Sequence, residues 1–177
     1  VADDHSNRLS SCMDLAVEPP FQIRPARSQL DVSAARTLFA EYAESLPVDL
    51  SYQDFGSEVG ELPGKYAEPL GELLIAWDAK VRPVACVGMR PLHGDRICEM
   101  KRLYVIPEAR SFGLGKLLTD TVIGTAKARG YVALRLDTLG TMIRATALYE
   151  RMGFRRIEPY YGPTPQDTIF MELNLTR

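Results

Sequence analysis

The segment from Arg110 to Lys116, with the sequence RSFGLGK, combines two glycines with two cations between an expected strand and an expected helix. Glycine lets the backbone approach a ligand closely, and the first amides of a helix have no partner inside that helix. Free N–H groups at the positive end of a helix suit a pyrophosphate. Phosphate binding is one interpretation of this turn, and a tight connection that needs glycine only for its geometry is the other.

Two well-known phosphate loops do not fit this turn. A Walker A loop needs glycine where Arg110 stands and Ser or Thr where Leu117 stands. A dinucleotide fingerprint needs a third glycine where Leu118 stands. The sequence therefore argues against a nucleotide hydrolase and against a dinucleotide-binding enzyme.

Three segments in this order resemble the GCN5-related N-acetyltransferase family. Its acetyl-CoA signature, Gln or Arg followed by x-x-Gly-x-Gly/Ala, stands here as RSFGLG at 110–115. KRLYVIP at 101–107 is similar to the family's fourth strand and the turn after it, and ATALYERMGF at 145–154 is similar to its A-x-x-L-Y-x-x-x-G-F segment. The resemblance is carried by motifs in the C-terminal half and only by the order of elements in the N-terminal half.

The resemblance implies that acetyl-CoA is the co-substrate. No metal is expected, because neither of the two histidines, His5 and His93, has a partner at metal-ligand spacing. Backbone groups of Leu103 and Val105 would pair with the pantetheine arm, and amides from Ser111 to Lys116 would hold the pyrophosphate. Many relatives carry Asn where Met142 stands, so that contact is not carried over. The expected cofactor-binding residues are Leu103, Tyr104, Val105, Arg110, Ser111, Phe112, Gly113, Leu114, Gly115 and Lys116.

Acetyl transfer needs a group that takes a proton from the amine and one that gives a proton to the leaving thiolate. Glu99 is the candidate base, eleven positions before Arg110 in an apolar strand. Strict alternation predicts that it shares a face with Leu103 and Val105. The alternative is a strand glutamate that pairs with a neighbouring Lys or Arg, or that faces solvent.

Tyr149 is the candidate acid, because it matches the family tyrosine whose hydroxyl approaches the cofactor sulfur. The alternative is a helix aromatic packed in the core, with its hydroxyl bonded elsewhere. Weaker candidates for the acceptor side are Tyr160-Tyr161, Tyr52, Phe55 and Glu58, and for polar substrate contacts Arg24, Asp137 and Asp167.

Hydrophobic periodicity supplies the elements that must position these residues. We expect strands at Phe21–Pro25, Leu73–Trp77, Val84–Met89, Arg96–Ile106, Val132–Leu136 and Ile169–Leu175. Helices are expected from Ser28 to before Pro47, weakly over Tyr52–Gly60, at Gly113–Arg129 and at Met142–Met152, with a loop at Gly60–Gly71 and a turn at Gly94-Asp95. The fold class is α/β: one mixed, mostly antiparallel sheet with a splayed central parallel pair and helices on both faces.

Composition limits the remaining possibilities. Lys and Arg number 21 against 23 Asp and Glu, which disfavours a general nucleic-acid binder, and no apolar run is long enough to span a membrane. Residues 1–20 are expected to be a flexible leader and residues 21–177 the acetyltransferase domain. Of the three cysteines, Cys86 and Cys98 are expected to be buried, and a cytoplasmic location is expected.

The sequence thus predicts an N-acetyltransferase that moves an acetyl group from acetyl-CoA directly to a primary amine of a small molecule, amino acid or peptide. A non-catalytic acetyl-CoA-binding sensor or interaction module, and an acyltransferase for longer chains, are the alternatives. A homodimer is compatible with the resemblance. Nothing in the sequence identifies the acceptor.

Overall fold

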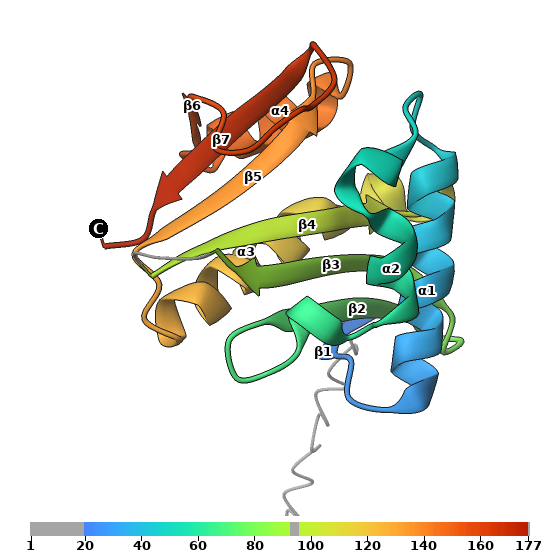
Figure 1. The fold of residues 1–177 in the computed structure, drawn as a ribbon. Coiled ribbons are helices and arrows are strands. Elements are labelled where there is room, and N and C mark those ends of the chain that lie inside the picture. The colour runs from blue at the N-terminus through green and yellow to red at the C-terminus, as the bar shows by residue number, and fades with distance from the viewer. Residues whose placement is uncertain (1–19, 93–95, 177) are drawn as a thin grey trace, which may run out of the picture.

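A computed structural model describes residues 20–92 and 96–176, which form one seven-stranded mixed sheet with helices on both faces (Figure 1). The strands are β1 (Phe21–Pro25), β2 (Glu72–Asp78), β3 (Pro83–Pro91), β4 (Ile97–Val105), β5 (Ala133–Leu139), β6 (Arg155–Ile157) and β7 (Thr168–Asn174). The α-helices are α1 (Gln29–Glu44), α2 (Phe55–Gly60), α3 (Leu114–Ala128) and α4 (Ile143–Arg151), and the 3-10 helices are η1 (Leu50–Gln53), η2 (Gly64–Tyr66) and η3 (Pro107–Phe112).

The strands lie in the order β1-β2-β3-β4-β5-β7-β6, and every neighbouring pair is antiparallel except β4 and β5. Helix α3 connects the two parallel strands, since the chain can enter a neighbouring strand in the same direction only after a crossover. The fold class expected from the sequence is confirmed, including the central parallel pair.

The helices begin and end where local chemistry favours it. Ser28 caps α1, because its side chain accepts a hydrogen bond from the amide of Asp31 while the Asp31 carboxylate accepts one from the Ser28 amide. Gly130 and Gly153 follow the two C-terminal helices with positive φ values of 79° and 93°. Only glycine adopts this backbone conformation without a steric cost, so both helices end there.

Apolar side chains from both faces of the sheet build one continuous core. Helix α3 buries Leu114, Leu118 and Val122 against β2, β3 and β4, and each such side chain contributes roughly 1.5–3 kcal/mol of hydrophobic stabilisation. On the face that carries α1 and α2, Tyr66 packs over Gly88, where a Cβ would lie 2.5 Å from the ring. Gly88 is therefore required for this close approach.

A bulge in β4 changes the expected alternation. Lys101 pairs with Gly88 and Tyr104 with Cys86, so two residues of β4, Arg102 and Leu103, lie opposite the single residue between them. Arg102 has a φ of 58°, which is uncommon for a residue other than glycine. The extra residue inverts the pattern beyond it.

The prediction that Glu99 shares a face with Leu103 and Val105 is therefore wrong. Directly opposite residues of an antiparallel pair point to the same face. Residues 90, 88 and 86 of β3 lie opposite Glu99, Lys101 and Tyr104, so Tyr104 continues the face of Glu99 beyond the bulge.

Most predicted elements agree with the structure to within a few residues, but the expected strand ranges do not include β6, and the helix expected over Tyr52–Gly60 is divided between η1 and α2. The expected loop at Gly60–Gly71 contains the short helix η2, and β5 extends to Leu139 instead of ending at Leu136. Two predicted segments lie outside the described residues: residues 1–19 of the predicted 1–20 leader, with His5 and Cys12, and the Gly94-Asp95 turn, with His93. Cys86 and Cys98 are both fully buried, as expected.

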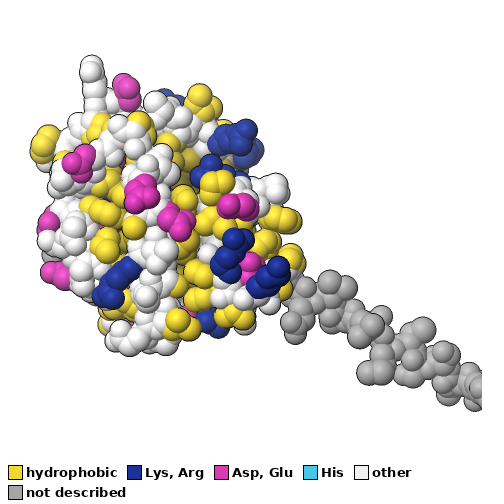
Figure 2. All heavy atoms as spheres, turned by 90° about the vertical axis from the view of Figure 1, so that its right-hand side faces the viewer, with side chains coloured by type: hydrophobic (Ala, Val, Ile, Leu, Met, Phe, Trp, Pro, Cys, Tyr) yellow, Lys and Arg dark blue, Asp and Glu magenta, His cyan; other side chains and the backbone are white. Residues whose placement is uncertain are grey.

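On the face that α1 covers, acidic, basic and apolar side chains are interspersed over the described part of the surface (Figure 2). No patch of a single charge dominates this view of residues 20–92 and 96–176. Within those ranges no helix has both the length and the apolar character to cross a membrane. The same residues hold no group of three or more His, Cys, Asp or Glu side chains arranged to bind a metal.

Candidate active site

The parallel strands β4 and β5 separate after three residue pairs. Pairing stops at Glu99 and Arg135, while β4 continues along β3 to Val105 and β5 continues along β7 to Leu139. The two strands diverge visibly in Figure 1. The edge of β4 from Met100 to Val105 therefore has no strand partner on its β5 side within the described chain.

A cavity of about 40 Å³ lies in this opening. It is lined from the C-terminal end of α1, from η1, from both diverging strands and from α4. Its polar and sulfur-bearing lining includes Tyr42, Tyr52, Gln53, Lys101, Arg102, Asp137, Met142 and Tyr149. A cavity of this size has room for on the order of one to three water molecules.

Tyr149, the predicted acid, reaches this cavity from α4. Its ring is 6% exposed and packs against Phe154 with the ring centres 5.7 Å apart. Burial, with Tyr42 and the charge of Asp137 nearby, raises the pKa of Tyr149, so its hydroxyl keeps its proton at neutral pH. Among the described residues this hydroxyl has no hydrogen-bond partner, which leaves it available as a donor.

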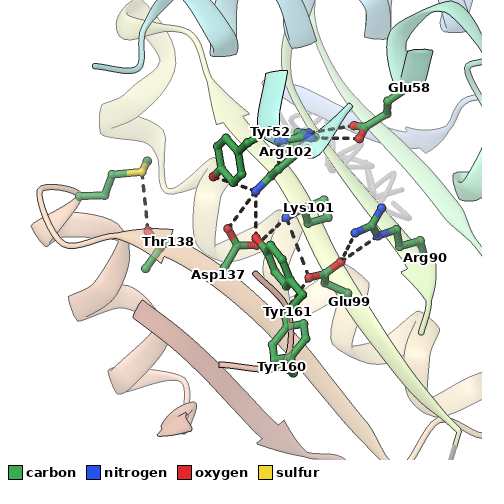
Figure 3. A network of polar contacts seen from close by, with 12 residues as sticks. Tyr52, Glu58, Arg90, Glu99, Lys101, Arg102, Asp137, Thr138, Tyr160 and Tyr161 are labelled. Carbon is green, nitrogen blue, oxygen red and sulfur yellow. Dashed lines mark hydrogen bonds and ion pairs between the residues drawn. The ribbon is translucent and has the colours of Figure 1, made fainter. Parts of the chain in front are cut away.

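Next to the cavity, buried and half-buried charges form what we call the charge network, in which three carboxylates each pair with one cation at 2.8 Å or less and also contact one tyrosine. Figure 3 labels all of these residues except Tyr66. The sets are Glu58 with Arg102 and Tyr66, Glu99 with Arg90 and Tyr160, and Asp137 with Lys101 and Tyr161. Charges of opposite sign are equal in number, which is what burial requires, because an unpaired charge in a protein interior is costly.

Glu58 and Arg102 are the most completely paired of these charges. Arg102 Nε and Nη2 donate to the two oxygens of Glu58 at 2.8 and 2.9 Å, and the Tyr66 hydroxyl donates to Glu58 Oε1 at 2.9 Å. Burial alone raises the pKa of Glu58, but the hydrogen bonds and charge of Arg102 outweigh it and hold that pKa below its ordinary value. The pair fixes α2 to β4.

Glu99, the predicted base, is completely buried. Arg90 Nη2 lies 2.7 Å from its Oε2, and the Tyr160 hydroxyl donates to its Oε1 at 2.6 Å. Lys101 Nζ lies 3.9 Å from Oε1. The carboxylate does not line the cavity, so any exchange of protons with a ligand has to pass through one of these neighbours.

Asp137 does line the cavity, and Lys101 Nζ donates to its Oδ1 at 2.5 Å. Burial alone raises the pKa of Asp137, but the charge and hydrogen bond of Lys101 and the hydrogen bond of Tyr161 outweigh it and lower that pKa. Asp137 is therefore ionised at neutral pH, and a carboxylate that holds its charge is better suited to bind a cation than to remove a proton.

The segment between β6 and β7 carries Tyr160 and Tyr161 over the start of the opening. Both rings stand edge-on to Phe170 of β7, with centres 5.0 and 5.2 Å apart. Their hydroxyls reach Glu99 on β4 and Asp137 on β5. That these tyrosines line the acceptor side stays a prediction.

The glycine turn lies at the other end of β4 and differs in character. Gly113 is the N-cap of α3 with a φ of 72°, and no side chain caps this helix. Phe112 is 60% exposed and packs on Phe21 with ring centres 5.1 Å apart, and Arg110 Nε donates to the Val105 carbonyl at 3.1 Å. Lys116 is exposed and pairs with Asp120 one turn later on the helix.

The remaining sequence candidates are spread over the molecule. Phe55 packs under the Arg102 guanidinium at 5.1 Å, so it supports the charge network. Arg24 pairs with Asp31 at 3.2 Å in the first turn of α1, away from the cavity. The Asp167 carbonyl accepts a hydrogen bond from Gly140 beyond the end of β5.

Sequence reasoning missed four side chains of the site: Arg90, Lys101, Arg102 and Gln53. The Lys-Arg pair belongs to a strand motif of the family resemblance, but its buried partners come from α2 and β5. A Lys-Arg doublet inside an apolar strand is the signal that was available, since such residues are almost never fully buried unless paired.

Comparisons with known proteins identify the family of this chain. A sequence model described as the acetyltransferase (GNAT) family matches residues 35–154. An uncharacterised N-acetyltransferase of Schizosaccharomyces pombe is 36% identical over 147 residues, covering 83% of this chain and 90% of that protein. The N-acetylaspartate synthetase of Danio rerio is 29% identical over 143 residues, covering 76% of this chain and 51% of that protein.

Among solved structures, an acetyltransferase of the GNAT family from Staphylococcus aureus superposes with a TM-score of 0.74. It is 21% identical and the match covers 88% of this chain and 99% of that one. At this identity the likeness concerns the fold alone, and it extends over the N-terminal half that the motifs do not reach.

Proposed function

The chain belongs to the GNAT acetyltransferase family, and from this premise we propose that it transfers an acetyl group from acetyl-CoA directly to a primary amine in a ternary complex. The observation that carries the proposal is the juxtaposition of Tyr149 and Asp137 at one cavity, where β4 and β5 diverge. One residue meets the leaving group there and the other faces the acceptor side.

The expected cofactor residues have the character that acetyl-CoA requires. The free edge of β4 at Leu103, Tyr104 and Val105 offers backbone groups to the pantetheine amides, as an added strand would. The uncapped start of α3 offers N–H groups to the pyrophosphate, and Gly113 has open space where a side chain would begin. Arg110 and Lys116 add positive charge at this end.

In the proposed reaction the amine nitrogen attacks the thioester carbonyl carbon, so that a C–N bond forms and the C–S bond then breaks. A backbone N–H of the free β4 edge stabilises the oxyanion. Tyr149 gives its proton to the departing thiolate and regains one from solvent. The products are the acetylated amine and free coenzyme A, and the amine nitrogen has lost one proton.

Glu99 enters the proposal as a base that acts indirectly. The Tyr160 hydroxyl donates to Glu99 Oε1 at 2.6 Å, so it can pass its proton to the carboxylate while it accepts one from a water on the amine. Under this scheme Tyr160→Phe and Glu99→Gln reduce kcat similarly, and the double variant is no worse than either one. If Glu99 has only a structural role, Glu99→Gln instead lowers stability, and the kcat of Tyr160→Phe equals that of the unaltered protein.

The acceptor class is a primary amine on a small molecule, amino acid or peptide. The name of the Danio rerio relative gives N-acetylaspartate as a product, which supports an amino acid or a molecule of similar size. We propose a cytoplasmic reaction, in keeping with two unpaired cysteine thiols inside the core.

The first experiment is calorimetric titration of acetyl-CoA into the protein and into Gly115→Glu. The new carboxylate would stand at the start of α3, where the pyrophosphate is expected, and the space at this position holds only Leu148 Cδ2 at 3.7 Å. The matched control is Gly124→Glu, because Gly124 is exposed in the same helix and has nothing within 4 Å of its Cβ position. We expect binding to be lost in the first variant and kept in the second.

The same proteins are then incubated with acetyl-CoA and pools of amines, amino acids and short peptides, and thiol release is followed. Amine-dependent release that Gly115→Glu abolishes supports the enzyme. Binding without release from any pool favours the non-catalytic sensor. If acetyl-CoA does not bind even the unaltered protein, the proposed use of acetyl-CoA is overturned.

A further inference from the structure

Gln53 of η1 lies at the cavity between Arg102 and Asp137, and Arg102 fixes the orientation of its side-chain amide. Arg102 Nη1 donates to Gln53 Oε1 at 2.8 Å. A guanidinium has no acceptor, so the amide oxygen must face Arg102 and the amide nitrogen must face the other way. The nitrogen therefore points at the opposite wall of the cavity.

Three oxygen atoms surround that nitrogen. Gln53 Nε2 lies 2.9 Å from the Tyr52 hydroxyl, 2.9 Å from the Tyr161 hydroxyl and 3.5 Å from Asp137 Oδ2. They come from η1, from the segment after β6 and from β5, so tertiary structure alone brings them together. A primary amide has only two hydrogens and cannot satisfy all three oxygens at once.

Of these three oxygens, the charged one, Asp137 Oδ2, makes the longest contact with the Gln53 amide. Lys101 holds Asp137 Oδ1 and the Tyr161 hydroxyl also reaches this carboxylate, whereas the contact of Oδ2 with the Gln53 amide is long, at 3.5 Å. An alkylammonium group carries three hydrogens and a positive charge, so it matches both the number of these oxygens and the charge of one of them. Figure 3 shows Tyr52, Asp137 and Tyr161 converging from different elements.

We infer that Tyr52, Asp137 and Tyr161 form the acceptor's ammonium-binding site and that the Gln53 amide occupies it until the acceptor displaces it. The inference deepens the proposed acetyl transfer and rests on it for its role in catalysis. It specifies an aliphatic primary amine, because an arylamine is uncharged at neutral pH. Asp137 binds and orients the cation, which releases one proton to solvent, so that the neutral amine attacks the thioester and passes its second proton through water and Tyr160 to Glu99.

Two further features fit this assignment. Gln53 itself lines the cavity of about 40 Å³, so displacement of that side chain enlarges the space for an acceptor. Gln53 belongs to a four-residue 3-10 helix and is half-buried, so a change of its rotamer does not disturb the core. Tyr149 lines the same cavity, which brings the bound amine and the proposed acid to one place.

The test is a titration with n-propylammonium chloride at neutral pH without acetyl-CoA, followed by the 15N side-chain amide resonance of Gln53. The resonance is assigned as the one missing from Gln53→Ala. We expect a saturable shift in the unaltered protein, with affinity at least about tenfold lower in Asp137→Asn, because a hydrogen bond to a charged group is lost. Propyltrimethylammonium, which has the same charge but no N–H group, is expected to cause no shift.

Glu61→Gln is the matched control, since it removes one exposed carboxylate outside the cavity lining. Tyr52→Phe removes one oxygen without touching a buried ion pair and is expected to weaken binding several-fold, so the inference stays testable even where Asp137→Asn misfolds. An equal shift with the quaternary ion, or affinity unchanged in both variants, overturns the site. Acetyl-CoA affinity is measured separately, so failure of this site and failure of acetyl-CoA binding are distinguishable.

Discussion

The charge network and the glycine turn lie at opposite ends of β4 and solve opposite problems. In the network, six charged side chains from β3, β4, β5 and α2 are buried or half-buried and paired with one another. In the turn, the cations are exposed, the helix start has no side-chain cap, and Lys116 has only a neighbour on its own helix. The charges of the network are satisfied by one another, whereas the glycine turn presents backbone N–H groups that no side chain caps.

This difference indicates how the two substrates would be recognised. A pyrophosphate can be held by backbone amides, whose direction is fixed by the helix, so exposed side chains there need no rigid support. A small acceptor must be positioned by side chains, and those are held in one geometry only when burial and partners restrict them. The buried pairs thus keep Asp137, Tyr52 and Tyr161 in place.

The largest expected effect comes from breaking the network at its most buried pair. Glu58→Ala leaves the Arg102 guanidinium, which is 2% exposed, without its carboxylate. We expect the free energy of unfolding to fall by about 3–5 kcal/mol, because an uncompensated buried charge remains. Urea denaturation measures this, and a loss no larger than that of an exposed pair would contradict the contrast between the two regions.

Tyr149→Phe tests catalysis without disturbing either region. The hydroxyl has no partner among the described residues, so its removal leaves stability and acetyl-CoA affinity nearly unchanged. We expect kcat for the best acceptor to fall by about 100-fold, as is typical when a general acid is lost. Steady-state kinetics with calorimetry of acetyl-CoA separates the two effects, and an unaltered kcat would remove Tyr149 from the mechanism.

Acid should weaken the network. The pKa values of Glu58 and Asp137 are lowered in the folded chain from ordinary values of 4.5 and 3.8. The unfolded chain therefore binds more protons in acid, so this stabilisation is complete above about pH 5 and is lost as the pH falls below those values. Urea midpoints measured across this range are expected to drop less steeply for Glu58→Ala, because that variant lacks one of the two carboxylates. An equally steep drop would place the acid sensitivity outside Glu58.

Lys116→Ala should have the smallest effect on stability. Its partner Asp120 is also exposed, and such pairs contribute about 0–1 kcal/mol. Acetyl-CoA affinity is expected to fall several-fold, and more at low salt than at high salt, because the lost interaction with phosphate is a screened one. Calorimetry of acetyl-CoA at two salt concentrations checks the affinity. A large loss of stability would contradict the assignment of Lys116 and Asp120 as a weak, exposed pair.

Neighbours along the chain are enough to establish the order of elements, the strand-to-helix turn and the residues that carry the family resemblance. Glycines allow a positive φ, Ser28 caps its helix, and apolar residues recur at the helical or strand period. Local patterns of this kind are readable from a single chain, and here they pointed to the glycine turn, whereas Tyr149 was found through the family resemblance.

Which side chains meet depends instead on the three-dimensional packing. The bulge at Arg102 inverts the alternation expected along β4, and no neighbour in the sequence signals it. Glu99 finds its partners in Arg90 and Tyr160, and Gln53 meets Asp137 from 84 positions away. Such contacts are set by how the strands diverge and how loops fold over them, because a buried charge takes its partner from whichever element packs beside it.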